Sequence, residues 1–285
     1  MSDTTDLNVA PHTWGLGGDL TVRRLGFGSM RITGPGIWGE PRDREGALAT
    51  LRRAIDLGVN LIDTADSYGP FVSERLIAEA LHPYPEDLVI ATKGGLTRSG
   101  PNQWQADGRP QHLRAACDGS LERLKLEQIP VYQFHRVDPT VSLEDSIGML
   151  VQLKDEGKIR HIGVCNVDED QLGQVLGLTP IVSVQNRYGH GDRTSEAIVD
   201  RCEVERLAFL PWAPLGGGSV SDATVERIAA AHGATARQVV LAWMLARSPV
   251  ILPIPGTSSV AHLEENVAAG ELLLTPQEIA ELNRP

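Results

Sequence analysis

Short apolar runs alternate with longer amphipathic segments along the whole chain. Eight of the apolar runs are predicted to be β-strands, the first beginning at Arg24 and the last at Val250. Each run is short, apolar on both faces and bounded by Gly, Pro or charged residues, which is typical of buried parallel strands. In chain order, the runs are RLGFG, NLIDT, LVIATK, PVYQFH, RHIGVCN, IVSVQN, LAFLPW and VILPIP.

The segments between these runs have apolar residues at helical spacing. The segment ALATLRRAIDLG ends at Gly58, a typical helix stop, and Thr235 with Gln238 has the spacing of a capping box before VVLAWMLA. Strand–helix alternation repeated eight times predicts an α/β fold, a (β/α)8 TIM barrel, as a single domain over residues 1–285. An open doubly wound sheet is the alternative, although it usually has fewer strands. The stretch WGLGGDLTVRR, around Trp14, predicts a short N-terminal β-hairpin.

The composition is that of a soluble globular protein, with 41% hydrophobic and 22% charged residues. The net charge of −11, without a basic stripe, argues against nucleic acid or an anionic membrane as a partner. The longest apolar run, VVLAWMLA, is far too short to span a bilayer. The start of the chain has no secretory signal, and Cys117, Cys165 and Cys202 have no paired spacing, so we expect a cytoplasmic protein with reduced thiols.

Four residues with acid, base or charge chemistry lie where predicted strands end. Asp63 ends the second strand, Tyr68 follows it in the next loop, Lys93 ends the third strand and His135 ends the fourth. In a barrel the carboxyl ends of the strands form one rim, and catalytic groups lie there. Taken singly, each residue also has a structural interpretation, such as a helix cap or a packed ring. Four of them at neighbouring strand ends indicate an active site.

These four side chains suit proton donation to an oxygen. A phenol is protonated at neutral pH, and an ammonium beside it favours its conjugate base and lowers its pKa. A carboxylate can keep the ammonium charged, and an imidazole can orient a substrate oxygen. No Ser or Cys nucleophile stands beside a base, so acyl transfer is not expected. Asp63, Asp66 and His135 could instead bind a divalent metal, but the usual ligand spacings are missing, so we expect no metal.

The motifs NLIDTADSYG, ATKGG, FHRVDP, GVCN and IPGTSSVAHLEEN resemble those of the aldo-keto reductases and occur in the same order. The resemblance covers nearly the whole chain. It implies that hydride passes from NADPH to the carbonyl of a small aldehyde or ketone, with Tyr68 as the general acid. It further implies that Lys93 adjusts the acidity of Tyr68, Asp63 supports Lys93, and His135 orients the carbonyl. Relatives that share IPGTSS include pyridoxal and pyridoxine oxidoreductases, which suggests this subgroup.

The resemblance also assigns cofactor residues. It implies that Asn166 and Gln185 bind the nicotinamide carboxamide, that Trp212 stacks on the ring, and that the backbone of residues 213–218 approaches the pyrophosphate. No GxGxxG motif follows a predicted strand, so a Rossmann site is not expected. The assigned positions are Ala213, Pro214, Leu215 and Gly216 near the pyrophosphate, and Gly256, Thr257, Ser258, His262, Glu265 and Asn266 around the adenosine 2′-phosphate and adenine.

Departures from the family pattern bear on the choice of cofactor. Many relatives have Lys at the position of Gly256 and Arg at that of His262, and both cations are missing here. Cys165 also stands where serine is common, and a thiol is a weaker hydrogen-bond partner. Hydroxyls and a helix start can bind a phosphate without a lysine, and a bound phosphate favours protonated His262. We expect a modest preference for NADPH that grows towards about pH 6, with NAD as a weaker alternative.

The substrate pocket is expected in the rim loops. Trp38, Phe71, Trp104 and Tyr188 follow the first, second, third and sixth strands, and such aromatic residues suggest an apolar or flat carbonyl compound. The sequence leaves a second function open, that of a nucleotide-sensing regulatory subunit resembling the potassium-channel β subunits, with little or no turnover. The short segment before the hairpin provides no long inactivating arm, which favours the enzyme.

Overall fold

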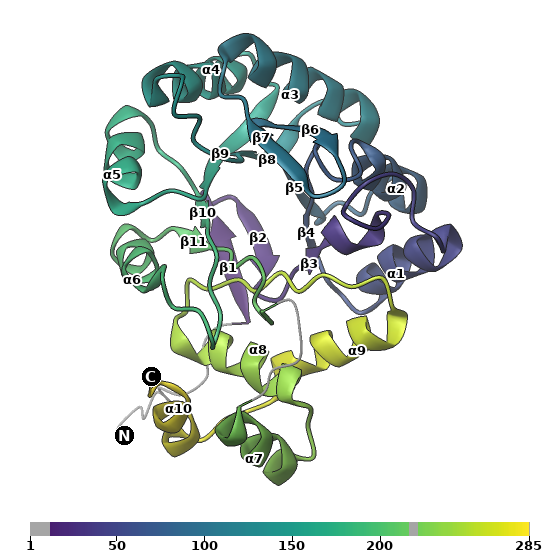
Figure 1. Ribbon diagram of the computed structural model, residues 1–285, viewed down its shortest axis with the longest axis vertical. Coiled ribbons are helices and arrows are strands. Elements are labelled where there is room, and N and C mark those ends of the chain that lie inside the picture. The colour runs from purple at the N-terminus through teal and green to yellow at the C-terminus, as the bar shows by residue number, and fades with distance from the viewer. Residues whose placement is uncertain (1–11, 217–221, 285) are drawn as a thin grey trace.

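The computed structural model describes residues 12–216 and 222–284, whose strands and helices alternate around one curved sheet (Figure 1). Seven parallel strands pair in the order β11-β10-β9-β8-β5-β4-β3. The strands are β1 (Thr13–Leu16), β2 (Leu20–Arg23), β3 (Phe27–Gly28), β4 (Leu61–Asp63), β5 (Val89–Gly94), β6 (Leu96–Gly100), β7 (Gln103–Ala106), β8 (Ile129–Phe134), β9 (Ile159–Cys165), β10 (Ser183–Gln185) and β11 (Ala208–Phe209). The helices are α1 (Arg44–Asp56), α2 (Val72–Leu81), α3 (Pro110–Leu124), α4 (Leu143–Asp155), α5 (Glu169–Leu178), α6 (Glu196–Glu205), α7 (Ala223–His232), α8 (Ala236–Arg247), α9 (Val260–Ala268) and α10 (Pro276–Leu282), with 3-10 helices η1 (Ser29–Ile32) and η2 (Ala269–Glu271). None of the described helices has both the length and the apolar content that a membrane crossing requires.

The eighth predicted strand, VILPIP, lies between β11 and β3 and closes the sheet into a (β/α)8 barrel. The Leu252 N–H donates to the Phe209 carbonyl at 2.8 Å, and the Gly26 N–H donates to the Pro253 carbonyl at 2.9 Å. Because Pro253 and Pro255 have no N–H, this segment cannot form a full ladder, and an isolated parallel bridge joins it to β11. The predicted barrel is confirmed, and its last strand is irregular.

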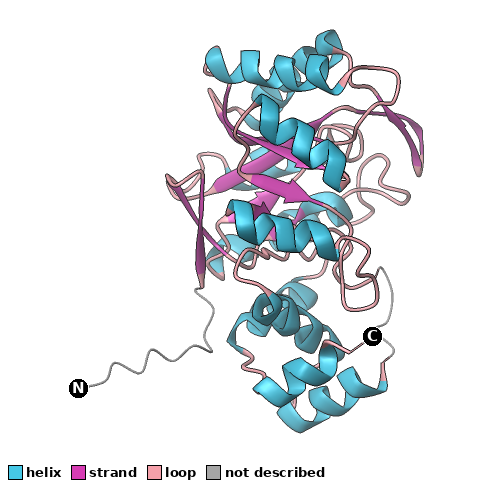
Figure 2. Ribbon diagram, turned by 90° about the vertical axis from the view of Figure 1, so that its left-hand side faces the viewer, coloured by secondary structure: helices cyan, strands magenta, loops and turns pink. Residues whose placement is uncertain are grey.

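Two antiparallel hairpins lie at opposite ends of the barrel (Figure 2). The hairpin β1–β2 is the predicted N-terminal one, and its Leu16 and Val22 belong to one buried cluster with Leu61 and Val89, at the starts of β4 and β5. The hairpin β6–β7 fills the connection after β5, where the sequence indicated only a long loop. The first hairpin therefore covers the amino ends of the strands and leaves their carboxyl ends free to form a site.

Helix boundaries follow the signals in the sequence. The Thr235 hydroxyl accepts from the Gln238 N–H while the Gln238 side chain accepts from the Thr235 N–H, which is the reciprocal capping box at the start of α8. At the end of α1, Gly58 has φ +83°, a left-handed conformation that favours glycine. Its N–H donates to the Ile55 carbonyl at 2.8 Å, which ends the helix.

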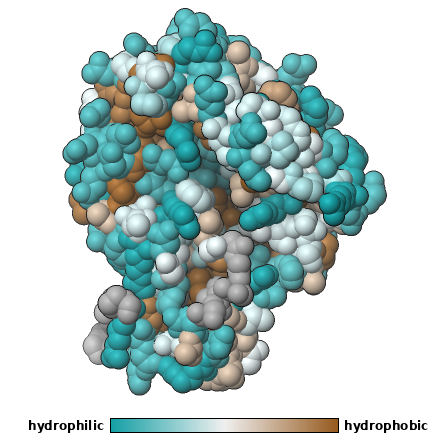
Figure 3. Space-filling view, in the orientation of Figure 1, coloured by the Kyte–Doolittle hydropathy of each residue, from teal (hydrophilic) through white to brown (hydrophobic). Residues whose placement is uncertain are grey.

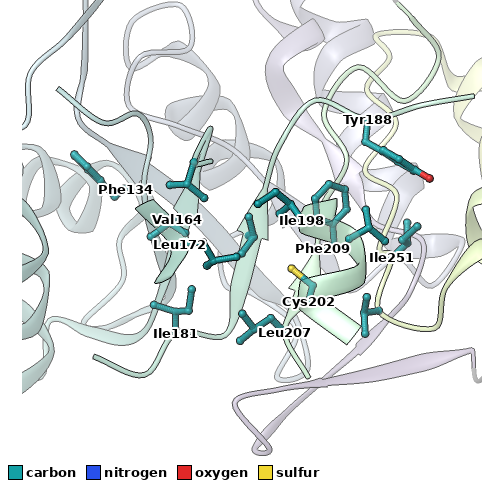
Figure 4. Close-up of a cluster of buried hydrophobic side chains, with 14 of the residues drawn as sticks. Phe134, Val164, Leu172, Ile181, Tyr188, Ile198, Cys202, Leu207, Phe209 and Ile251 are labelled. Atoms are coloured by element: carbon teal, nitrogen blue, oxygen red, sulfur yellow. The ribbon is translucent and has the colours of Figure 1, made fainter. Parts of the chain in front are cut away.

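The helices pack on the outside of the sheet through a continuous apolar layer. In the part shown in Figure 4, Phe134 and Val164 of the sheet lie near Leu172 of α5, and Phe209 lies near Ile198 of α6. All five side chains are at most 4% exposed. The face seen in Figure 3 is mainly hydrophilic, with hydrophobic residues in scattered patches. A rigid layer of this kind fixes the strand ends from which the site is built.

Candidate active site

The four polar residues predicted at strand ends lie together at the carboxyl rim of the barrel. Asp63 is the last residue of β4, Lys93 lies in β5 and His135 directly follows β8. These three strands are neighbours in the sheet, and Tyr68 lies in the loop between β4 and α2. All four residues are buried, and none is more than 7% exposed. The sequence prediction of their convergence is therefore matched by the geometry.

The Lys93 ammonium is the centre of this cluster. Its Nζ donates to Asp63 Oδ1 at 2.6 Å, to the Thr64 carbonyl at 2.8 Å and to the Tyr68 hydroxyl at 3.3 Å. The rings of Tyr68 and His135 lie edge to face, with centroids 5.9 Å apart. The ammonium therefore has three acceptors at hydrogen-bond distance, and one of them, the phenol, also packs against the imidazole.

Two glutamines complete the surroundings of the Asp63 carboxylate. Its Oδ2 accepts from Gln133 Nε2 at 3.0 Å and from Gln185 Nε2 at 2.8 Å, while Oδ1 accepts from Lys93. Gln185, which was expected to bind a nicotinamide carboxamide, directs its amide nitrogen to Asp63. Gln133 was missed from the sequence, although it stands two residues before His135 and so lies on the same face of the strand.

Burial governs the proton affinities of these groups. It raises the pKa of Tyr68 to about 12, and the nearby Lys93 ammonium opposes this rise only in part. The expected lowering of the phenol pKa is therefore wrong in its net direction, because loss of solvent outweighs one adjacent cation. Burial by itself would lower the pKa of Lys93, but the negative charge of Asp63 raises it overall. Burial, followed by the Lys93 ammonium, holds the pKa of His135 well below its usual value, so the imidazole is neutral at pH 7.

The acidic neighbour considered as a metal ligand has a different setting. Asp66 is 4% exposed, and burial, followed by the negative charge of Glu74, raises the pKa of its carboxyl well above the usual value. Among the residues that the structure describes, none makes a hydrogen bond with its Oδ1. Within residues 12–216 and 222–284 there is no group of three or more His, Cys, Asp or Glu side chains arranged to hold a metal ion.

Asn166 and Trp212 are joined beside the cluster. Asn166, directly after β9, has φ +56°, and its Nδ2 donates to the His135 carbonyl at 3.0 Å. Its Oδ1 accepts from Trp212 Nε1 at 3.0 Å. The Trp212 side chain is half-buried, and the Arg187 guanidinium lies 5.7 Å from the ring centroid. An aromatic ring is thus held at the rim through Asn166, which also contacts the His135 carbonyl.

The segments expected to hold phosphates are only partly described. Ala213 (φ +52°) and Gly216 (φ +65°) have left-handed backbone conformations, and Gly217 and Gly218 lie outside the described residues. After the barrel closes, Ser259 caps α9 by accepting from the His262 N–H at 3.4 Å. The neighbouring positions Gly256, Ser258 and His262 are exposed, whereas Thr257 and Asn266 are buried.

Glu265 faces away from this segment. Its Oε1 accepts from the Thr235 hydroxyl at 2.6 Å, and its carbonyl accepts from Gln238 Nε2 at 3.1 Å. The side chain expected to hold an adenine is therefore engaged with the start of α8. This contact joins α9 to α8 and was not visible in the sequence, because the two segments are 30 residues apart.

Backbone crowding explains why residue 256 is a glycine. A Cβ atom at Gly256 would lie 2.6 Å from the Gly28 carbonyl oxygen, which is too close for a side chain. The same Cβ would lie 3.5 Å from Cγ of Arg31, an exposed residue of η1. The lysine common at this position in relatives therefore cannot be accommodated here without a backbone shift. The aliphatic stem of Arg31, a residue not predicted from the sequence, passes this position from η1, which directly follows the first barrel strand.

The four aromatic residues predicted to line a substrate pocket have different positions. Trp104 lies perpendicular to Tyr68 with ring centroids 6.4 Å apart, and Trp38 pairs with Gly69, the residue after Tyr68. Phe71 is 41% exposed and packs under the Arg123 guanidinium of α3. Two of the four therefore lie beside the polar cluster, and Phe71 turns towards a helix.

Tyr188 is not a pocket residue. It is fully buried, its hydroxyl donates to Glu196 Oε2 at 2.9 Å, and its ring packs against Phe209 and Trp243. The prediction was wrong because position after a strand does not reveal which way a side chain points. This tyrosine turns outward into the layer between sheet and helices, as Figure 4 shows.

Comparison with known proteins identifies the family of the chain. Residues 24–284 match the model of the Aldo/keto reductase family. An uncharacterized oxidoreductase of Schizosaccharomyces pombe is 46% identical over 268 residues, covering 93% of this chain and 87% of the relative. Pyridoxine 4-dehydrogenase of Escherichia coli K12 is 41% identical over 273 residues, covering 93% of this chain and 96% of the relative.

A solved structure gives the same result for the fold. The crystal structure of an aldo/keto reductase from Klebsiella pneumoniae in complex with NADP and acetate has a TM-score of 0.80 and 27% identity. The match covers 96% of this chain and 94% of that one. Given a family match over most of its length and two relatives above 40% identity, this chain belongs to the aldo/keto reductase family.

Proposed function

We propose that the protein is an NADPH-dependent reductase of small aldehydes or ketones. The observation that carries the proposal is the buried Lys93 ammonium, which contacts both Asp63 Oδ1 at 2.6 Å and the Tyr68 hydroxyl at 3.3 Å. An acid that contacts a cation and packs against a neutral imidazole suits protonation of an oxygen that is gaining negative charge. Relatives named as reductases and a dehydrogenase support the same reaction class.

Each residue has one task in this reaction. The hydride would come from a reduced nicotinamide cofactor when one is bound at the rim. Tyr68 donates a proton to the carbonyl oxygen, and Lys93 stabilises the phenolate that remains. Asp63 keeps the ammonium charged and in place, and neutral His135 orients the carbonyl oxygen by a hydrogen bond. All four are needed at the moment when negative charge develops on oxygen.

The donors on the rim fit a dinucleotide phosphate. Trp212 offers a half-buried ring for the nicotinamide, and the hydroxyls of Thr257, Ser258 and Ser259 lie at the start of α9, where backbone N–H groups attract phosphate. The stem of Arg31 passes Gly256 and His262 lies in the first turn of α9, so both side chains are candidates for a charged contact with the phosphate. We infer that NADPH is the preferred cofactor, with NADH as the weaker one.

Oxidation of NADPH, followed by absorbance with a panel of aldehydes, tests the function. The panel includes pyridoxal, because the Escherichia coli relative is named pyridoxine 4-dehydrogenase. Turnover with at least one aldehyde is the expected result. Tight binding of NADPH with no turnover on any of them would favour the alternative, a nucleotide-sensing subunit.

Replacement of Trp212 by Ala tests the position of the nicotinamide. In wild type, cofactor binding should quench tryptophan fluorescence, because the indole of Trp212 lies at the rim and is only half-buried. Trp212→Ala should lose most of this quench and weaken binding by roughly 1–3 kcal/mol, the range for stacking of a base on an aromatic ring. Trp243→Phe, which changes a fully buried indole, is the control and should keep the quench. A quench that survives in Trp212→Ala would place the nicotinamide elsewhere.

The choice between NADPH and NADH should depend on pH through His262. A bound 2′-phosphate favours the protonated imidazole, so the ratio of the NADH to the NADPH dissociation constant should increase as the pH falls from about 8 to about 6. His262→Ala should remove this dependence and lower the ratio at acidic pH, by roughly the 1.5–3 kcal/mol of a hydrogen bond to a charged group. NADH, which lacks the phosphate, is the internal control. A ratio that changes neither with pH nor in His262→Ala would exclude His262 from the phosphate site.

A further inference from the structure

Arg98 of β6 connects three separate segments of the rim. Its Nη1 donates to the Ile37 carbonyl at 2.8 Å and to the Ser67 carbonyl at 2.9 Å. Its Nη2 donates to the Gly36 carbonyl at 3.0 Å. One guanidinium therefore holds the loop after β3, the hairpin β6–β7 and the loop that carries Tyr68, which directly follows Ser67.

The same side chain fixes the aromatic residues of the rim. Its Cζ lies 3.5 Å from the centroid of the Trp104 ring and 5.7 Å from that of Trp38. Within its own hairpin, Nε donates to the Gln103 carbonyl at 2.9 Å. Trp104 in turn lies edge to face with Tyr68. Arg98 thus connects the loop of the proposed acid with both indoles, one of which lies against the acid.

One of the segments that Arg98 contacts has a strained backbone. Ile37 has φ +56°, a left-handed conformation that is rare and unfavourable for a β-branched residue and persists only where the surroundings enforce it. Its carbonyl accepts from Arg98 and also from the Gly69 N–H at 3.3 Å. The strained turn is therefore held by Arg98 together with the residue that follows Tyr68.

Geometry rather than charge pairing explains the choice of arginine. No acidic side chain in residues 12–216 and 222–284 forms an ion pair with Arg98, and its donors all reach carbonyl oxygens. A guanidinium carries five N–H donors in a planar fork, whereas a lysine carries three on one nitrogen. A lysine could keep the charge but could not hold three segments and cover an indole face.

We propose that Arg98 is a positioning residue that sets specificity for carbonyl compounds with a planar ring, by holding Trp38 and Trp104 beside Tyr68. The inference rests on the proposed reductase function and concerns the substrate side of the same site. Two indoles and a phenol form flat apolar walls that a ring can pack against, and a small aliphatic aldehyde gains little from them. Loss of Arg98 should therefore affect ring-bearing substrates selectively.

The test compares Arg98→Met and Arg98→Lys with wild type, using benzaldehyde and propanal. In both variants, KM for benzaldehyde should increase by about tenfold or more, in the range for a lost pocket contact, while KM for propanal and the NADPH dissociation constant change little. If Arg98→Met does not fold, Arg98→Lys carries the same expectation. Wild-type KM values in Arg98→Lys, or equal losses for both aldehydes, would overturn the proposal.

Arg193→Met is the matched control. The Arg193 guanidinium lies 4.6 Å from the centroid of Trp243 and donates to the Leu282 carbonyl at 2.6 Å, so it makes the same kinds of contact elsewhere in the fold. Its removal should lower stability without changing either KM. The proposed role of Arg98 can be tested separately from the proposed reductase function. Calorimetry measures binding of benzaldehyde to the complex of the protein with NADP⁺, in which no reduction can occur. Weaker binding in the Arg98 variants supports this inference even without turnover, and unchanged binding refutes it.

Discussion

Tyr68→Phe is expected to lower kcat for aldehyde reduction by about 10²–10⁴-fold, the usual contribution of a general acid. The substitution removes the hydroxyl that Lys93 contacts at 3.3 Å and keeps the ring that packs against Trp104 and His135. Lys93 retains Asp63 and the Thr64 carbonyl as acceptors, so the site should remain folded. The dissociation constant for NADPH should hardly change. A kcat close to that of wild type would remove Tyr68 from the reaction.

The pH dependence gives a second readout of the same residue. Because burial raises the pKa of Tyr68 to about 12, the phenol stays protonated at all moderately alkaline pH values. The rate of aldehyde reduction should therefore not fall through ionisation of Tyr68 up to about pH 10. The reverse reaction, oxidation of the alcohol, needs the phenolate, so its rate should increase about tenfold per pH unit. The increase of the oxidation rate with pH should disappear in Tyr68→Phe.

Lys93→Met is expected to damage both activity and stability. The Asp63 side chain is only 3% exposed, and removing its cation leaves a buried carboxylate with the donors of Gln133 and Gln185 alone. Breaking a buried ion pair from one side costs about 3–5 kcal/mol, and the two amide donors should keep the loss near the lower value. Urea unfolding gives the stability, and steady-state kinetics should show a loss of kcat similar to that of Tyr68→Phe.

A double substitution separates the two roles of Lys93. Lys93→Met combined with Asp63→Asn removes both charges, so stability should recover relative to Lys93→Met alone while kcat stays low. Recovery of activity together with stability would mean that Lys93 matters only for folding. A Lys93→Met protein as stable as wild type would contradict the contacts described here.

The barrel and the polar cluster were predictable because both depend on a repeating rule. Parallel strands separated by helices place all their carboxyl ends on one rim, so Asp63, Lys93 and His135 could be brought together without knowing any distance. The Gln133 donor follows the same rule, since it stands two residues before His135 and shares its face of the extended chain. An uncharged amide, however, is not an obvious candidate in a sequence. Local capping signals, such as that at Thr235, were equally reliable, because they act within one turn of helix.

Features that depend on contacts between distant segments were not predictable. The direction of Tyr188 depends on packing against Trp243, 55 residues later in a helix that could be placed anywhere around the barrel. The glycine at position 256 is required by the carbonyl of Gly28, at the opposite end of the chain. The role of Arg98 depends on three loops meeting at one guanidinium. None of these contacts produces a periodic or local pattern in the amino-acid sequence.

Transfer of deuterium tests the central claim most directly. Wild-type protein is incubated with an aldehyde and with NADPH that carries deuterium at both C4 positions, and the alcohol is analysed by mass spectrometry and NMR. The expected product carries one deuterium on the former carbonyl carbon and a hydroxyl proton from solvent, and Tyr68→Phe should form it far more slowly. Tight binding of NADPH without any labelled alcohol, or an alcohol with no deuterium at that carbon, would contradict hydride transfer at this site.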